Sequence, residues 1–294
     1  MLTHHTNADS RPERVVVIGA NSFVARALTA RLITAGVEVL GLGRAQVDLA
    51  ADGAGPILAG FLRPTDSVVA VAAKAPCRNV VDFLVNARII ATMVDALRAQ
   101  PVAHLLNISS DAVYGDEPVP LTEAAPAAPG SLHGAMHLSR EIALSGLGIP
   151  FATLRPTLIY GASDPHGGYG PNMFRRKANR GEEILLFGEG EERRDHVAVE
   201  DVAELAARIL LRRSTGRLNA ASGQVTSFRD IAVAAARIAG RSVAITGRPR
   251  SGPMPHNGYR PFDVSATTAA FPEFTYTDLE SGMVRAQATE FPHG

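Results

Sequence analysis

A short apolar strand, a glycine turn and an amphipathic helix follow one another near the start of the chain. Residues 15–18 are four β-branched residues in a row, a run typical of a parallel strand buried on both faces. Gly19 begins a turn, and apolar residues then recur at helical spacing from Phe23 until Gly36 ends the helix. This unit predicts an α/β fold, because such a strand is buried only inside a parallel sheet covered by helices.

The same alternation continues along the chain and predicts a doubly wound parallel sheet. Further strands are predicted at 37–42, 67–73, 102–109, 151–155 and 197–199, and further helices at 80–100, 132–147 and 200–211. Two segments differ from this pattern in composition. Segment 161–194 is rich in Gly, Asn, Arg and Glu, and segment 247–262 has the Pro, Gly and His content of loops. We expect a smaller C-terminal substrate domain that interleaves with the sheet.

These patterns give explicit domain boundaries. The polar first residues have no apolar signal core and predict a disordered tail over 1–13. A Rossmann-type dinucleotide-binding domain is expected over 14–165 and about 196–222, and a substrate-binding lid over about 166–195 and 223–294.

Charge and composition exclude several classes of protein. The 294 residues carry 29 basic and 29 acidic side chains, and this zero net charge lacks the basic signature of a nucleic-acid binder. Apolar runs are only long enough for strands, so no membrane span is expected. The single cysteine, Cys77, forms no internal disulfide, which favours a reducing compartment and hence the cytoplasm.

The glycine turn has the spacing of a phosphate-binding loop. In segment 19–25 (GANSFVA), the three positions that usually hold glycine are Gly19, Ser22 and Ala25. Backbone N–H groups at a helix N-terminus bind a pyrophosphate, and the hydroxyl of Ser22 adds a donor where glycine would give closer approach. We expect Asn21, Phe23 and Val24 to complete this cofactor site.

The end of the second predicted strand indicates which dinucleotide is preferred. An acidic residue there would bind the ribose hydroxyls of NAD, but the segment reads Gly43-Arg44. A guanidinium matches the 2′-phosphate of NADP, so NADP is predicted, with NAD and a merely solvated Arg44 as alternatives. Asp48 and Leu49 follow where the adenine edge is expected.

Several spaced motifs resemble the extended short-chain dehydrogenase/reductase family, in its NAD-dependent epimerase/dehydratase branch. Segment 108–115 (ISSDAVYG) is similar to S-S-x-x-V-Y-G, and 154–161 (LRPTLIYG) to L-R-P-x-x-x-Y-G. Segment 187–190 (FGEG), followed by 194–197 (RDHV), resembles the lid motif of enzymes that act on sugar nucleotides. Asn86 falls on the family's buried asparagine. The likeness extends from Val15 to about Met283.

The resemblance also implies roles and contacts. It places Ala72, Ala73 and Pro156 beside the cofactor, and Asn172 and Arg194 on a nucleotide diphosphate substrate. It further implies that two copies of the chain associate as a homodimer.

The helix at 132–147 departs from the family. Where the family has Y-x-x-x-K, this chain has His133 and His137, and Glu141 keeps the acidic position that follows. In the family the tyrosine exchanges a proton with the substrate oxygen, and the lysine holds the nicotinamide ribose. Histidine titrates near ~6.5 without help, so His133 is predicted as the acid/base, Ser110 as the donor to the substrate oxygen, and His137 as the ribose contact.

Two other interpretations of this helix stay open. His133, His137 and Glu141 lie at i, i+4 and i+8, a spacing used by helical zinc sites, although the family frame already explains Glu141 and no metal is predicted. The loss of both family residues is also consistent with a catalytically silent nucleotide-binding protein that regulates or scaffolds.

Asp111 narrows the reaction class. Dehydratases of the family carry an Asp-Glu pair after the catalytic Ser or Thr, whereas here Ala112 follows Asp111. Epimerase or keto-reductase chemistry needs one proton-transfer group, so we expect an NADP-dependent oxidoreductase or epimerase acting on a hydroxyl or ketone of a nucleotide-sugar-like substrate. Asp111 is kept as a catalytic candidate, with capping of a strand end as the alternative.

Overall fold

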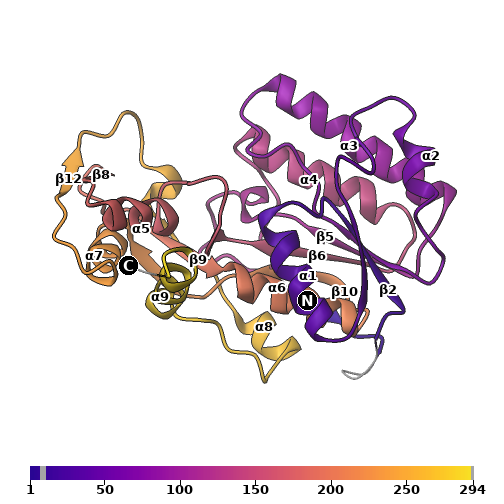
Figure 1. Cartoon of the computed structure of the whole chain (residues 1–294). Helices are drawn as coiled ribbons and strands as arrows, with labels where there is room; N and C mark the ends of the chain where they lie inside the picture. The colour runs from indigo at the N-terminus through magenta and orange to yellow at the C-terminus, as the bar shows by residue number, and fades with distance from the viewer. Residues whose placement is uncertain (7–10, 293–294) are drawn as a thin grey trace.

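A seven-stranded sheet organises the larger part of the molecule (Figure 1). The computed structural model describes residues 1–6 and 11–292. Neighbouring strands are parallel except at one edge, where the strand Leu2–Thr3 runs antiparallel to its neighbour Thr215–Ala220. In spatial order they are β1 (Leu2–Thr3), β10 (Thr215–Ala220), β6 (Phe151–Pro156), β5 (His104–Ile108), β4 (Ser67–Ala70), β2 (Arg14–Ile18) and β3 (Glu38–Leu42). This order confirms the predicted doubly wound α/β fold.

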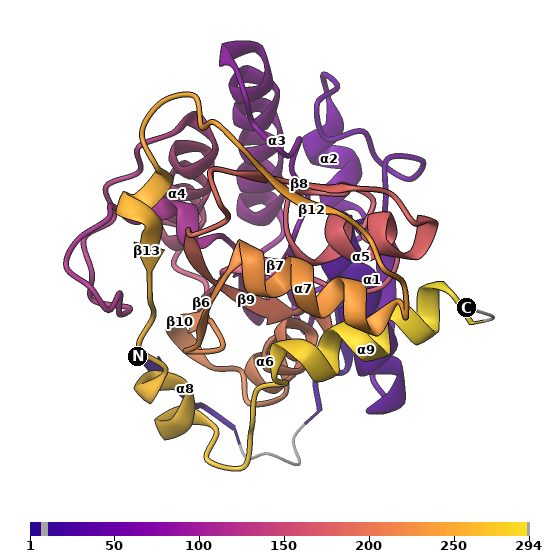
Figure 2. The same ribbon diagram turned by 90° about the vertical axis from the view of Figure 1, so that its left-hand side faces the viewer.

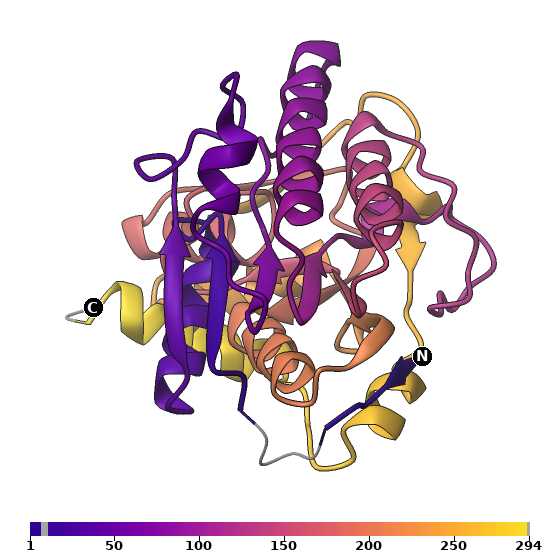
Figure 3. The same ribbon diagram turned by 90° about the vertical axis from the view of Figure 1, so that its right-hand side faces the viewer.

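Helices cover both faces of this sheet (Figure 3). One face carries α1 (Phe23–Thr34) and α6 (Val199–Leu211), which pack on each other. The other carries α2 (Ala54–Ala59), α3 (Val80–Ala99) and α4 (Leu132–Ser145). Every residue of β2, β4 and β5 is buried, as expected for strands between two layers of helices.

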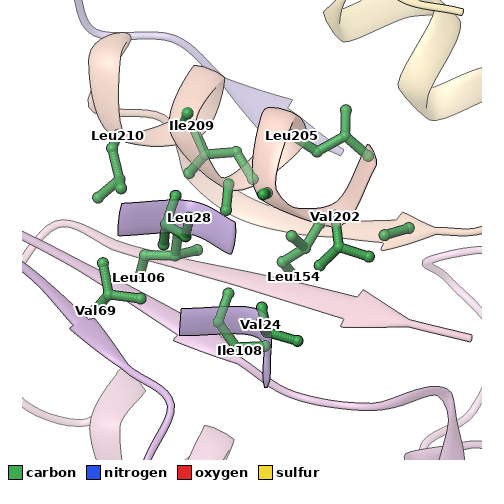
Figure 4. Packing of buried hydrophobic residues seen from close by; sticks show 14 of the residues in the cluster. Val24, Leu28, Val69, Leu106, Ile108, Leu154, Val202, Leu205, Ile209 and Leu210 are labelled. Atoms are coloured by element: carbon green, nitrogen blue, oxygen red, sulfur yellow. The ribbon is translucent and has the colours of Figure 1, made fainter. Parts of the chain in front are cut away.

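The core under α1 and α6 is built from aliphatic side chains (Figure 4). Leu28 of α1 and Val202 of α6 meet Leu106 and Leu154 of the central strands, and all four are fully buried. This packing fixes the carboxyl ends of the strands, where a doubly wound sheet binds its ligands.

A smaller unit lies beyond those strand ends (Figure 1) and faces the viewer in Figure 2. It contains a four-stranded sheet, a two-stranded sheet and three helices around a core that includes Phe174 and Phe228. The four-stranded sheet comprises β7 (Leu158–Tyr160), β9 (Arg193–Ala198), β11 (Val225–Ser227) and β13 (Tyr259–Arg260). The other elements are β8 (Ile184–Phe187), β12 (Ile245–Arg248), α5 (Pro171–Arg180), α7 (Phe228–Ile238) and α9 (Leu279–Glu290).

The structure differs from the predicted boundaries at three places. The predicted disordered tail is wrong for residues 1–6, because β1 pairs with β10; residues 7–10 lie outside the described residues. Residues 196–198 complete β9 of the smaller sheet instead of starting the second part of the large unit. Within the predicted lid, α8 (Ser265–Ala270) and Phe271 pack on the core of the large sheet, because their apolar side chains find burial there.

Among the described residues, each helix is too short or too polar to cross a bilayer.

Candidate active site

A large cleft runs along the carboxyl ends of the parallel strands and continues toward the smaller unit. Its volume is about 1220 Å³. All the residues predicted for the site contribute to its wall. Most of them follow strands of the large sheet, whose ends lie at one edge, while α4 and the smaller unit provide the others. They are Gly19, Asn21, Ser22, Phe23, Val24, Arg44, Asp48, Leu49, Ala72, Ala73, Ser110, Asp111, His133, His137, Pro156, Asn172 and Arg194.

The turn after β2 is built for close approach of backbone atoms. Gly19 has a φ of +96°, and a Cβ there would lie 2.6 Å from the backbone nitrogen of Ala72. Only glycine fits this position without a shift of the segment that follows β4. The turn therefore opens the N-terminus of α1 toward the cleft, as a bound pyrophosphate requires.

Ser22, which replaces the middle glycine, is the N-cap of α1. Its Oγ accepts a hydrogen bond from the backbone N–H of Ala25 at 3.3 Å. The hydroxyl still has its own proton to donate, and Ser22 lines the cleft. The residues present thus fit a dinucleotide. The Ser22 hydroxyl accepts one N–H of the helix N-terminus, and its own proton remains available to a phosphate oxygen.

Arg44 lines the cleft, and most of its side chain is exposed to solvent. Its side chain is 83% exposed, and its nearest acid is Asp48, at 3.8 Å between Nε and Oδ2. An exposed pair at this distance contributes little, so Arg44 can turn to a phosphate. A Cβ at Gly43 would lie 2.8 Å from Asn21 Nδ2, so a larger residue there would displace the Asn21 side chain.

His133 and His137 lie side by side on the cleft-facing side of α4. Their ring centroids are 4.7 Å apart with the rings nearly perpendicular. Nδ1 of His133 accepts the backbone N–H of Cys77 at 3.4 Å, which leaves Nε2 for a ligand. Burial, together with the charge of Arg140, lowers the pKa of both rings, partly offset at His133 by Asp111. Both imidazoles are therefore neutral at pH 7.

Helix α4 packs tightly on the loop that carries Ser110. A Cβ at Gly134 would lie 2.0 Å from the carbonyl oxygen of Ala112, so glycine is required where α4 meets the 3₁₀ turn Asp111–Val113. Ser110 Oγ accepts the backbone N–H of Ala112 at 3.1 Å and lines the cleft. Ser110 and His133 thus share one wall.

Asp111 is held by arginines. Its Oδ2 accepts a hydrogen bond from Arg260 Nε at 3.3 Å and lies 3.9 Å from Arg194 Nη2. Its side chain is 9% exposed, so both contacts are shielded from solvent. The geometry suits a carboxylate that orders the loop after β5.

Glu141 bonds to Arg155 and Ser109 and to neither histidine among the described residues. It accepts hydrogen bonds from Arg155 Nε at 2.9 Å and Nη2 at 2.5 Å, and one from Ser109 Oγ at 2.5 Å. No group of three His, Cys, Asp or Glu suited to a metal ion occurs within residues 1–6 and 11–292. Glu141 instead ties α4 to β5 and β6.

The two predicted substrate residues are both partly engaged within the protein. Asn172 is buried; its Oδ1 accepts the N–H of Gly161 at 3.1 Å and its Nδ2 donates to Asp164 at 2.9 Å. Arg194 lies 3.3 Å from Glu192 and 3.9 Å from Asp111. The amide of Asn172 therefore shapes the loop over the cleft, while Arg194 keeps donors available toward it.

Three cleft residues were missed from the sequence. Tyr169 anchors the 166–170 loop, its ring centroid 4.6 Å from that of Phe228. His196 lines the cleft, and burial lowers its pKa to about 3. His256 Nδ1 donates to Asp116 Oδ1 at 2.5 Å, and His256 has a φ of +52°. His196 lies in the RDHV segment that resembles the family's lid motif, and for Tyr169 and His256 the Gly and His content of the loops was the only signal. Neither signal identified the individual side chains.

Comparisons with known proteins agree with this geometry. The model of the NAD dependent epimerase/dehydratase family matches residues 15–221. The chain is 28% identical over 261 residues to a UDP-glucose 4-epimerase of Mycolicibacterium smegmatis, which covers 77% of this chain and 83% of that one. It is 27% identical over 257 residues to a putative GDP-L-fucose synthase 2 of Oryza sativa subsp. japonica, covering 77% and 73%.

A solved structure is similar over almost the full length. UDP-glucose 4-epimerase of Thermus thermophilus, in complex with NAD, has a TM-score of 0.81 and 25% identity, covering 95% of this chain and 99% of that one.

Proposed function

The chain belongs to the NAD-dependent epimerase/dehydratase family, and from this premise we propose that it is an NAD(P)-dependent epimerase or oxidoreductase of nucleotide sugars. The observation that carries the proposal is that Ser110, His133 and His137 line the same cleft as the glycine turn before α1. The two curated relatives named above bear the names of enzymes of sugar-nucleotide metabolism, and this chain matches most of the length of each. Both facts support the substrate class.

The turn and the strand ends hold the cofactor. Gly19 and Ser22 bind the pyrophosphate at the N-terminus of α1, and His137 holds the nicotinamide ribose. Arg44, exposed and weakly paired, favours the 2′-phosphate of NADP. The nicotinamide, when bound, supplies reversible hydride transfer.

The proton moves through His133. Ser110 donates a hydrogen bond to the substrate oxygen and positions it for transfer. For this transfer the neutral ring of His133 carries its proton on Nδ1, which gives up the weak 3.4 Å contact with the Cys77 N–H. Nε2 then has the lone pair that takes the proton of the substrate hydroxyl when the substrate is oxidised, and the imidazolium returns that proton in the reverse direction. Asp111 orders the loop that carries Ser110, and Arg194 binds the substrate diphosphate.

The test is nicotinamide absorbance with a panel of nucleotide sugars, beginning with UDP-glucose. We expect turnover to fall by about 10²–10⁴-fold in His133→Phe, the range for a lost general acid–base group. His5→Phe, at an exposed histidine outside the cleft, is the matched control and keeps wild-type turnover. Cofactor binding with no turnover on any substrate would instead support the silent nucleotide-binding alternative.

We further propose that the enzyme is a homodimer working in a reducing cytoplasm. Val80, Val81 and Leu84 of α3 and Ile142 of α4 are large apolar side chains exposed on adjacent helices, as at an uncovered interface. Cys77 is a free, buried thiol. Light scattering is expected to give twice the 31.0 kDa chain mass, and Leu84→Glu is expected to give the monomer.

A further inference from the structure

Arg140 is a fully buried arginine directly behind the catalytic wall. It lies one turn after His137 on α4, and its relative exposure is 1%. Its Nη1 donates to the carbonyl oxygen of Ala72 at 2.9 Å, and its Nη2 donates to the carbonyl oxygen of Ile108. Ala72 and Ile108 both line the cleft, so Arg140 braces the ends of β4 and β5 against α4.

No carboxylate of the described residues forms an ion pair with this guanidinium. The adjacent Glu141 turns to Arg155, and Nε of Arg140 has no hydrogen-bond partner within the described part of the chain. Burial lowers the pKa of Arg140 to about 10, so the side chain is still charged at pH 7. An unpaired buried cation is costly, and an apolar side chain would fill the same space more cheaply. Stability alone therefore does not account for an arginine here.

The guanidinium also contacts His137. Nη2 of Arg140 lies 3.4 Å from Nδ1 of His137. Arginine can only donate hydrogen bonds, so Nδ1 must be the acceptor and the proton of the neutral ring must sit on Nε2. Burial and then the charge of Arg140 hold the pKa of His137 well below its usual range, which keeps the ring neutral.

We propose that Arg140 is a positioning residue that fixes His137 as the Nε2–H tautomer and supplies, from behind the cleft wall, the positive charge that His137 lacks. The inference rests on the proposed function for the identity of the cofactor. His137 then presents a hydrogen-bond donor to the cleft at all pH values where the enzyme is folded and Arg140 is charged.

The fixed charge has a second consequence. An oxidised nicotinamide carries a positive charge and a reduced one does not, so a buried cation nearby disfavours the oxidised form. We expect the ratio of the dissociation constants of NADP⁺ and NADPH to be larger in the wild type than in a variant without the charge.

The first experiment reads the tautomer. Long-range ¹H–¹⁵N correlation spectra of the histidine rings, with His137 assigned from the spectrum of His137→Asn, are expected to show the proton on Nε2 in the wild type. In Arg140→Met the ring is expected to populate the Nδ1–H form. A proton on Nδ1 in the wild type, or the same tautomer in the folded Met variant, would overturn the positioning role.

The second experiment tests the effect of the charge on cofactor binding. NADPH binding is titrated by the fluorescence of the reduced nicotinamide, and NADP⁺ binding by its displacement of NADPH. The NADP⁺/NADPH ratio of dissociation constants is expected to fall at least about fivefold in Arg140→Met. It is expected to stay near wild type in Arg140→Lys, which keeps the cation, and in the control Arg98→Met, which removes an exposed arginine from α3. An unchanged ratio in Arg140→Met, or an equal fall in Arg140→Lys, would overturn the charge role.

These readouts need no turnover. If Arg140→Met does not fold, the wild-type tautomer and the Lys variant still decide the proposal. A wild type that shows the expected tautomer and ratio but no activity would refute the proposed function and leave this inference standing. If the wild type is active but Arg140→Met changes neither the His137 tautomer nor the ratio of the NADP⁺ and NADPH dissociation constants, only the inference is refuted.

Discussion

Removing the carboxylate of Glu141 tests how α4 is held against the sheet. Glu141 and Arg155 form a two-pronged ion pair with side chains only 9% and 3% exposed, and Ser109 adds a third hydrogen bond to the same carboxylate. In Glu141→Ala the guanidinium of Arg155 stays buried next to β6 and keeps a hydrogen bond to the neutral hydroxyl of Tyr114, at 2.8 Å. The variant therefore leaves an uncompensated buried charge.

The expected loss follows from that charge. Breaking a buried pair by removing one partner costs about 3–5 kcal/mol of unfolding free energy, because the remaining ion keeps its desolvation penalty. A domain of this size changes its melting temperature by roughly 2–4 °C per kcal/mol, so a drop on the order of 10 °C is expected. Activity below the melting temperature is expected to fall as well, because α4 carries both histidines.

Urea unfolding followed by circular dichroism measures the loss. The matched control is Glu182→Ala, which breaks the two-pronged pair with Arg180 at the surface, where both side chains are about half exposed. Surface pairs contribute about 0–1 kcal/mol, so this control is expected to unfold close to the wild type. If Glu141→Ala lost no more stability than Glu182→Ala, the reasoning about the buried pair would be wrong.

Three further predictions address the site and the sheet. Gly134→Ala is expected to cut turnover and stability, because its Cβ would lie 2.0 Å from the Ala112 oxygen. Gly146→Ala at the C-cap of the same helix, where the nearest atoms lie 3.7 Å from the added Cβ, is expected to be neutral in thermal melts. Burial lowers the pKa of His104 to about 4, so between pH 6.5 and 4 the unfolded chain binds more protons than the folded one. As the pH is lowered through that window, the free energy of unfolding is expected to fall by up to about 1.4 kcal/mol per pH unit. The fall is expected to be smaller in His104→Gln. Arg44→Ala is expected to weaken NADPH binding about tenfold in titrations and to leave NADH unchanged, and equal weakening of both would contradict a 2′-phosphate contact.

The sequence predicts the elements whose burial pattern is local. The apolar run of β2 and the periodicity of α1 define the phosphate-binding turn within a few residues, and the frame provided by Glu141 places His133 and His137 on one helix face. Because a doubly wound sheet brings its strand ends together, the residues that follow successive strands are predictable members of one cleft wall.

Contacts that depend on tertiary distance are not predictable in this way. β1 is two residues long and pairs with a strand more than 200 residues away, which no local pattern reports. Arg140 occupies an interior position of α4 in the helical period, but its bonds to the carbonyls of Ala72 and Ile108 exist only because β4 and β5 end beside it. The locking of Asp111 by Arg260 likewise joins residues 149 positions apart.

The pairing of β1 with β10 has a consequence for solubility. β10 is the last parallel strand on its side of the sheet, and Leu2–Thr3 occupy hydrogen-bonding groups of Thr215 and Gly216 that an uncovered edge would present to other molecules. His4 and Thr6 continue the cover through bonds to Ser214 and Leu211. In a chain shortened to begin at Arg11, these backbone groups of β10 would be exposed and could pair with a strand of another molecule. We therefore expect the first six residues to reduce edge-to-edge aggregation.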